Sequence, residues 1–223
     1  MEEIIRKLEA IESEALAELH RAAPAASRDE MGLRLEEFDG IRVSAANRGC
    51  NIVVNRAIGL GLVSPATREQ IRRIRNVYYD SGVSRYFVHL SPEGQPEPLT
   101  ELAEELGLVR DRAWMKFARS DVPVAQRITG LEIREIGPDH AHDFGRIAGS
   151  AFDLEEMAWP MLEGLVGRPG WHVFMSFSGT TPAGAGTLFV KDGVGWTDWG
   201  ATDPAFRRQG SQSALLTRRI AQA

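Results

Sequence analysis

One stretch decides how the chain folds: Gly200-Ala201-Thr202-Asp203-Pro204-Ala205-Phe206-Arg207-Arg208-Gln209-Gly210-Ser211-Gln212-Ser213-Ala214-Leu215-Leu216. It predicts the end of a strand, a short turn that contains Pro204, a second turn at Gly210 and then a helix. The first amides of a helix lack intrahelical acceptors and lie at the positive end of its dipole, so they are a natural seat for a pyrophosphate. Gly210 would let the backbone approach an anion without a Cβ in the way. Ser211 and Ser213 would add hydroxyl donors.

The charge of this last segment agrees with an anion site. From residue 204 to the end, the charged residues are all basic: Arg207, Arg208, Arg218 and Arg219. The chain as a whole carries a net charge of −5, so the segment is a local patch that attracts anions. The charge run taken alone also fits a solvated helix with basic residues.

Working outward from this stretch, the preceding residues alternate and turn as a small sheet protein does. Residues 131–136 predict a strand, and Gly137-Pro138 starts a helix. A second helix is expected over 154–166, interrupted near Pro160. Strands follow over 171–177, 183–190 and 194–202, with a tight turn at Lys191-Asp192-Gly193. Residues 131–223 therefore predict the order β-α-α-β-β-β-α.

The first half has a pattern of its own. Its predicted elements are a helix over 2–20, a hairpin of strands 41–45 and 51–60 with its turn at 47–49, a helix from Ser64-Pro65 to Gly82, a strand over 85–90, a helix over 98–106 and a strand over 109–118. Residues 120–129 have mixed polarity and no clear period. We therefore predict two domains, 1–122 and 123–223.

The stretch quoted first, with its order strand, turn, Arg-Arg-Gln-Gly, helix, resembles motif A of the GCN5-related N-acetyltransferases (GNAT). In that pattern Arg207 and Gly210 fill the first and fourth places, whereas Gln212 stands where Gly or Ala is usual. The resemblance covers roughly residues 131–223. It implies an α/β (α+β) fold with a mixed, mostly antiparallel sheet flanked by helices, preceded here by a degenerate GNAT-like N-terminal module.

The resemblance also implies a cofactor and its contacts. Acetyl-CoA would be the co-substrate, with the backbone of Gly200, Ala201 and Thr202 pairing with its pantetheine arm. The pyrophosphate would be wrapped by the amides of Arg207, Arg208, Gln209, Gly210, Ser211, Gln212 and Ser213. An amine would attack the thioester directly, which needs a base for its proton and a donor to the leaving thiolate.

Candidates for the base are few. Trp196 stands where the family often places an acid, and Asp198 lies one pleat away, so Asp198 is named as the base candidate; an ordinary acid on the strand surface is the alternative. His172 on a neighbouring predicted strand is a second candidate, although a lone His beside Trp171 is more often structural.

The chain ends inside the helix after the turn, whereas the family continues with a strand, a helix and two strands that usually supply a tyrosine as general acid. The tyrosines of this chain are Tyr78, Tyr79 and Tyr86, all in the first half. One interpretation is a truncated domain, and the other is a permuted or swapped sheet completed by the first half. We favour a degenerate N-terminal module followed by a shortened GNAT domain. An open edge strand would invite a homodimer.

Composition limits the remaining choices. Hydrophobic residues make up 43% and charged residues 26% of the 223, as in a globular protein, and the acidic balance argues against a nucleic-acid partner. A lone Cys50 excludes an internal disulfide, and His140 and His142, two apart on a predicted helix, do not face each other, so no metal is expected. Without a signal peptide or a membrane-length apolar run, a cytoplasmic location is expected.

These observations favour an N-acyltransferase that moves an acetyl group from acetyl-CoA to a primary amine of a small molecule or peptide. The alternative is a module of the same fold that binds acyl-CoA or a partner protein without catalysis. A plain α/β domain without a CoA site is the third hypothesis.

Overall fold

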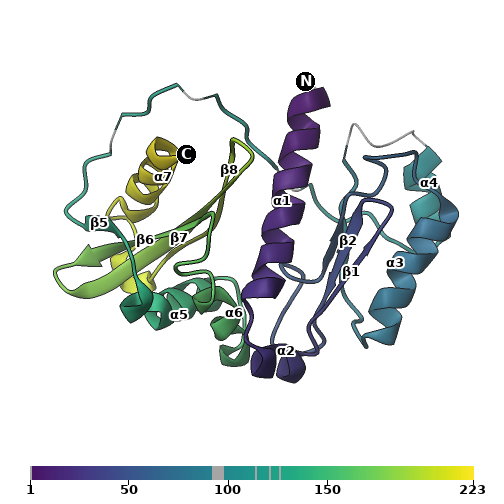
Figure 1. The fold of residues 1–223 in the computed structure, drawn as a ribbon, viewed down its shortest axis with the longest axis horizontal. Coiled ribbons are helices and arrows are strands. Elements are labelled where there is room, and N and C mark those ends of the chain that lie inside the picture. Colours follow the sequence, from purple (N-terminus) through teal and green to yellow (C-terminus); the bar gives the residue numbers. More distant parts are fainter. Residues whose placement is uncertain (1, 92–97, 114, 121, 126) are drawn as a thin grey trace. The chain divides into compact units, whose positions relative to one another are not determined.

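The computed structural model describes residues 2–91, 98–113, 115–120, 122–125 and 127–223 (Figure 1). Short 3-10 helices lie at Pro138–His140, Glu156–Ala158 and Pro204–Phe206. The helices and strands, in chain order, are α1 (Glu2–Ala22), α2 (Ala25–Met31), β1 (Arg34–Phe38), β2 (Ile41–Ala45), β3 (Arg56–Ile58), α3 (Arg68–Asp80), β4 (Phe87–Val88), α4 (Pro98–Glu105), β5 (Glu132–Glu135), α5 (Ala141–Ala151), α6 (Trp159–Glu163), β6 (Trp171–Ser178), β7 (Thr181–Lys191), β8 (Val194–Thr202) and α7 (Ser211–Gln222).

The chain forms two compact units, each with its own sheet. Unit 1 consists of Met1–Ala17 and Gly32–Ala118, and unit 2 of Glu18–Met31 and Arg119–Ala223. The end of α1 and all of α2 thus belong to unit 2. A division of the sequence at a single point cannot describe this arrangement. The division into domains 1–122 and 123–223 stays a prediction, and residues 121 and 126 of its linker lie outside the described residues.

Unit 2 is built on an antiparallel sheet in the order β5-β6-β7-β8. Figure 1 shows α7 on one face of this sheet and α5 with α6 on the other. Because side chains alternate along a strand, Leu188 of β7 points to the α7 face and packs with Phe174 and Leu215 in a buried cluster. The two-residue turn Asp192-Gly193 has positive φ at both positions, as a tight hairpin between β7 and β8 requires. The predicted β-α-α-β-β-β-α order is confirmed.

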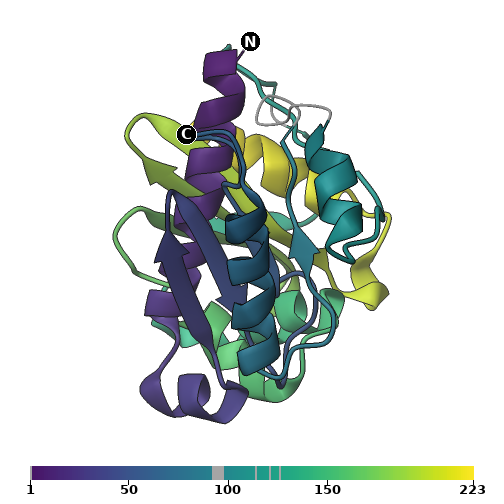
Figure 2. The same cartoon turned by 90° about the vertical axis from the view of Figure 1, so that its right-hand side faces the viewer.

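Unit 1 holds a second sheet in the order β1-β2-β3-β4, in which only the β3–β4 pair is parallel. Figure 2 shows α3 lying across one face of this sheet. Ile71, Ile74 and Tyr78 of α3 are fully buried against Val43 of β2 and other apolar side chains. The predicted class, a mixed fold with mostly antiparallel sheets flanked by helices, is confirmed in both units.

The predicted pairing of strands 41–45 and 51–60 is confirmed only in part, because β2 pairs antiparallel with the short strand β3. A second partner of β2, the strand β1, was not predicted; it precedes β2 through the Asp39-Gly40 turn, which has positive φ at both residues. Residues 51–60 do not form the expected long strand, because Asn55 directs its side chain to the amide and the carbonyl of Ala46 at 2.7 and 3.0 Å. Asparagine side chains that bond to the backbone compete with a strand ladder, so only Arg56–Ile58 pairs as β3.

Two more expectations in unit 1 are corrected. Helix α3 starts at Arg68 rather than at Pro65, because Thr67 and Gln70 form a reciprocal capping box that fixes the start. Residues 109–118 were expected to be a strand, but no regular element is assigned to the described residues of this segment, and Trp114 lies outside them. No helix among the described residues is both long and apolar enough to cross a membrane.

Candidate functional site

A cavity of about 460 Å³ opens in unit 2 where β8 leads into α7. Nine of the ten residues predicted from the sequence to bind the cofactor line this cavity. The tenth, Gln209, is not among its lining residues. Ala151, at the end of α5, also lines it and was missed, because a small residue at a helix end carries no signal of its own. The lining residues are Ala151, Gly200, Ala201, Thr202, Arg207, Arg208, Gly210, Ser211, Gln212 and Ser213.

The backbone amides of the turn are open. Among the described residues, no acceptor is found for any amide from Arg208 to Ser213, whereas Ala214 N donates to Gly210 O at 3.0 Å as the first bond of α7. No side chain caps the helix. Helix N-termini without caps leave these first amides open to water or an anionic ligand, so the turn has the chemistry of an anion site.

The turn owes its shape to two left-handed residues. Arg208 has φ 64° and Gly210, the N-cap of α7, has φ 83°. Alternating handedness in successive residues makes a concave nest of amides. Thr129 supports the turn from outside, because its hydroxyl donates to Gln209 O at 2.7 Å. Sequence reasoning missed Thr129, which lies 80 residues earlier in the chain.

Asp203 holds the preceding part of the turn. Its carboxylate accepts a bond from Ala205 N at 3.0 Å, and its own amide donates to Ala183 O on β7 at 2.9 Å. Arg146 of α5 approaches the same carboxylate at 3.6 Å. The Asp-Pro pair therefore directs the chain from β8 into the turn and leaves the later amides unengaged.

The side chains of Ser211 and Gln212 have partners on the neighbouring strands. Ser211 was expected to offer its hydroxyl to the anion, but the residue is 2% exposed and its Oγ lies 2.8 Å from Ser176 Oγ on β6. Ser213 is exposed, and its role as a hydroxyl donor to the anion stays a prediction. Gln212, the departure from the motif, turns inward, and its amide donates to Thr202 Oγ1 at 3.1 Å and to Ala201 O. The larger side chain is thus accommodated by the sheet.

The basic patch is smaller than the sequence indicated. Arg207 and Arg208 are exposed and line the cavity. Arg218 lies 5.4 Å from the ring centre of Phe174, and Arg219 is 4% exposed, so these two do not face the cavity. The positive charge at the candidate anion site therefore comes from two arginines and from the helix terminus.

A β-bulge adjoins the cavity at Gly200. Ala185 pairs with Ala201 and Thr187 with Asp198, so Trp199 and Gly200 together oppose the single residue Gly186. Trp199 has φ 49°, an uncommon value for a residue with a side chain. Bulges redirect a strand and are frequent beside active sites. Neither the bulge nor its register was predicted.

The base candidates have other partners in the structure. The carboxylate of Asp198 accepts bonds from Trp199 N at 2.8 Å and from Trp196 Nε1 at 3.3 Å, and it lies outside the described lining of the cavity. His172 Nδ1 lies 2.8 Å from Glu135 Oε1 on β5. The described lining contains no carboxylate, imidazole or phenol.

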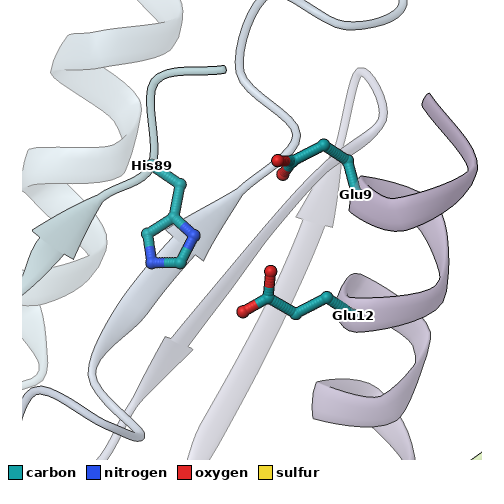
Figure 3. A group of neighbouring side chains, drawn as sticks. All are labelled: Glu9, Glu12 and His89. Carbon is teal, nitrogen blue, oxygen red and sulfur yellow. The ribbon is translucent and has the colours of Figure 1, made fainter. Parts of the chain in front are cut away.

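A second group of titratable side chains lies in unit 1 (Figure 3). Glu9 and Glu12 of α1 point toward His89, which follows β4, and their nearest ligand atoms lie within 4.8 Å of one another. Carboxylates and an imidazole are donors that Zn²⁺ prefers. The sequence analysis did not anticipate this group, although two acids one helical turn apart on an amphipathic helix are visible in it.

Two cations already neutralise this group. Lys116 Nζ lies 2.5 Å from a carboxylate oxygen of Glu9 and of Glu12, and Arg56 Nη1 lies 2.5 Å from the other oxygen of Glu12. Burial alone would raise the pKa of Glu12, but Arg56 and Lys116 outweigh it and lower that pKa. Burial, helped by the same two cations, lowers the pKa of His89 to about 4. We therefore interpret the group as a buried ion-pair network in which the ammonium of Lys116 lies where a metal ion would otherwise bind.

The fold of the chain is similar to that of solved structures. A protein described as a GCN5-related N-acetyltransferase from Kribbella flavida is similar over 92% of this chain and 80% of its own, with a TM-score of 0.57 and 16% identity. The chain has the GNAT fold. The extent of the match means that the likeness includes residues of both units.

Other likenesses are weaker and add nothing to this assignment. A GCN5-related N-acetyltransferase from Ralstonia eutropha JMP134 has a TM-score of 0.36 at 18% identity, over 41% of this chain and 74% of its own. A functionally unknown conserved protein from Staphylococcus epidermidis ATCC 12228 has a TM-score of 0.48 at 12% identity, over 89% and 84%. No family model matches the chain, and no curated protein matches it either. The GNAT fold thus rests on structure, and the reaction is argued from the site.

Proposed function

We propose that this chain is an N-acyltransferase that moves an acetyl group from acetyl-CoA to a primary amine of a small molecule or peptide. One observation carries the proposal: the amides from Arg208 to Ser213 find no acceptor among the described residues, and they belong to residues that line a cavity, with Gln209 as the exception. A GNAT fold with an open nest of amides at the start of α7 is suited to hold the pyrophosphate of CoA.

The residues present fit the proposed co-substrate in charge and shape. Arg207 and Arg208 add positive charge beside the nest, where phosphate groups would lie. Gly200 to Thr202 form one wall of the same cavity. An acyl-CoA whose pyrophosphate lay on the turn would run its pantetheine arm along this wall toward the bulge.

The chemistry is a transfer between two nucleophiles. The amine nitrogen forms a bond to the thioester carbon, the carbon–sulfur bond breaks, and the thiolate leaves with the electron pair and takes up a proton. The amine loses its extra proton, either before the attack or to a base outside the described lining. The role of the cavity wall is to hold the thioester in place and to donate hydrogen bonds toward its oxygen.

A second function is supported by the composition of the lining. The described lining offers no group that accepts a proton near neutral pH. A module of GNAT fold that binds acyl-CoA without turning it over is therefore the alternative. The homodimer, the cytoplasmic location and the identity of the acceptor stay predictions.

Two measurements test the proposal in sequence. Isothermal titration of acetyl-CoA into the purified chain should show binding, and Arg208→Glu should weaken it by about tenfold, because the charge beside the phosphates is reversed. The matched control is Arg218→Glu, which changes the net charge equally at a residue outside the described lining of the cavity and should leave the affinity unchanged. Equal affinity of the wild type and Arg208→Glu would contradict the placement of the site.

The second measurement separates the enzyme from the binding module. Thiol release from acetyl-CoA is followed over a panel of primary amines, and an acyltransferase should show amine-dependent release that Arg208→Glu reduces. Tight binding without release over the whole panel would favour the non-catalytic module.

A further inference from the structure

One cation of α7 is buried in the sheet rather than directed at solvent. Arg219 is 4% exposed, and its Nη1 donates to Thr187 O at 3.2 Å and to Asp198 O at 3.1 Å. Its Nε donates to Leu215 O one turn earlier in the helix at 3.2 Å. Burying a guanidinium is unfavourable unless its donors are satisfied, so its position on these carbonyls needs a reason.

The two strand carbonyls that Arg219 holds are those that flank the bulge. Thr187 and Asp198 are the last regular pair before Trp199 and Gly200 oppose Gly186. The sheet makes room for the guanidinium through its glycines, because a Cβ on Gly186 would lie 2.7 Å from Arg219 Cζ. A Cβ on Gly200 would lie 3.5 Å from Arg219 Nη2. The sequence around the bulge is thus matched to the guanidinium.

Asp198 also supports the bulge, through its own side chain and its carbonyl. Its carboxylate accepts the bond from Trp199 N at 2.8 Å, which fixes the left-handed residue of the bulge. Its carbonyl accepts from Thr187 Oγ1 at 3.0 Å as well as from Arg219. Burial lowers the pKa of Arg219 to about 10, and the nearby Asp198 opposes that shift, so the guanidinium is charged at neutral pH.

We propose that Arg219, assisted by Asp198, is a positioning residue for acyl transfer: it holds the bulge so that the backbone of Gly200, which belongs to the bulge and lines the cavity, presents a fixed donor to the thioester carbonyl. This inference rests on the proposed function. A pantetheine arm that runs from the turn along Thr202, Ala201 and Gly200 reaches the bulge. The thioester at the end of that arm would then lie at the bulge. Fixed backbone donors in a positive field stabilise negative charge on that oxygen. Asp198 then helps Arg219 to hold the bulge and does not act as a general base.

A purely structural arginine would give a different result. Its loss would lower stability and would affect every property of bound acetyl-CoA alike. A positioning residue instead affects the thioester and leaves the phosphate contacts, which lie at the other end of the cavity, unchanged. The test therefore needs a readout that belongs to the thioester alone.

The experiment uses acetyl-CoA labelled with ¹³C at the thioester carbonyl, which needs no knowledge of the acceptor. On binding to the wild type, the carbonyl resonance should move downfield because the carbonyl is polarised. In Arg219→Met the affinity for CoA should stay within about threefold, whereas most of the downfield shift should be lost. Arg219→Lys, which keeps the charge without the planar fork, should retain part of the shift. Arg218→Met on the same helix is the matched control and should behave as the wild type.

The outcomes separate the inference from the function on which it rests. A full downfield shift in Arg219→Met overturns the positioning role while the CoA site stands. No binding of acetyl-CoA to the wild type overturns the proposed function and this inference with it. Should Arg219→Met fail to fold, Gly186→Ala serves instead, because its Cβ displaces the guanidinium without removing it and should also diminish the shift. Where an amine acceptor is found, kcat should fall by about ten- to a hundredfold in Arg219→Met with little change in the KM for acetyl-CoA.

Discussion

The turn from Arg208 to Ser213 and the buried group of Glu9, Glu12 and His89 both gather polar groups in a small volume, but they treat those groups in opposite ways. In the turn, the described residues provide no acceptors for the amides. In the buried group, Arg56 and Lys116 lie within 2.5 Å of the carboxylate oxygens. The residue types alone would have favoured the buried group as a site, since it has the donors of a metal centre.

The difference teaches that a site is recognised by what the protein leaves unsatisfied. A buried polar group is stable only when it is paired, so a paired network needs no ligand. An open helix terminus beside a cavity is unpaired at a place that a ligand can reach. The following predictions test each side of this comparison, from the largest expected effect to the smallest.

Glu12→Gln should strongly destabilise the chain. The substitution leaves Arg56 and Lys116 without their shared partner, and breaking a buried ion pair on one side costs about 3–5 kcal/mol. Chemical denaturation followed by circular dichroism measures the free energy of unfolding. The control is Glu3→Gln, which removes an exposed pair with Lys7 and should have no measurable effect. A loss in Glu12→Gln no larger than in the control would show that the network is not structural.

Gly210→Val should close the anion site. Valine at φ 83° is strained by about 1–3 kcal/mol, and the backbone should leave the left-handed region, which turns the amides away from the cavity. Titration with CoA should show affinity lower by at least about tenfold. Gly179→Val is the matched control, because Gly179 has φ 60° in the β6–β7 turn with open space around its Cβ. If both variants bind CoA alike, the amides of the turn do not hold the ligand.

Stability should fall as the pH drops from about 6.5 to 4. Burial lowers the pKa of both His20 and His89 to about 4, so in this window the unfolded chain binds protons that the folded chain does not. Stability therefore rises with pH across the window and is lost on acidification, by roughly 1–3 kcal/mol for each buried histidine. Denaturation midpoints measured at several pH values check this. His89→Gln should flatten the dependence, and an unchanged slope in that variant would contradict the role given to His89.

Zn²⁺ should leave the melting temperature of the wild type unchanged, because Lys116 already neutralises Glu9 and Glu12. Lys116→Met removes that ammonium, and Zn²⁺ should then raise the melting temperature of the variant by a few degrees, about what roughly 1 kcal/mol of binding produces. Thermal melts with and without Zn²⁺ measure both. A Zn²⁺-dependent rise in the wild type would show that the buried group is a metal site after all.

The parts of the fold that the sequence predicts are those governed by local rules. Alternation identified β6, β7 and β8, and the Asp192-Gly193 turn and Gly210 have the backbone conformations that glycine and its neighbours indicate. The first strand of unit 1 was not predicted, although the Asp39-Gly40 turn that follows it is a strong hairpin signal. The Asn-rich segment after β2 was predicted as one long strand. That segment instead forms turns held by asparagine side chains.

The same limit applies to the site: residues that are neighbours in the sequence could be predicted, and residues brought together by folding could not. The residues along the turn follow one another in the chain, so the motif named them together. Arg219 looked like another surface cation, and only the packing of α7 on Gly186 reveals that it is buried. Thr129 and the bulge depend on contacts between distant segments, which a single sequence does not contain.

The central claim is that the open amides of the turn bind the diphosphate of CoA, and the most direct test is to observe those amides. In ¹H–¹⁵N correlation spectra of the labelled chain, adding CoA should move the amide signals of Arg208 to Ser213 more than any others, with Gly210 among the largest shifts. Signals from this turn that stay in place at saturating CoA, or larger shifts elsewhere in the chain, would contradict the account.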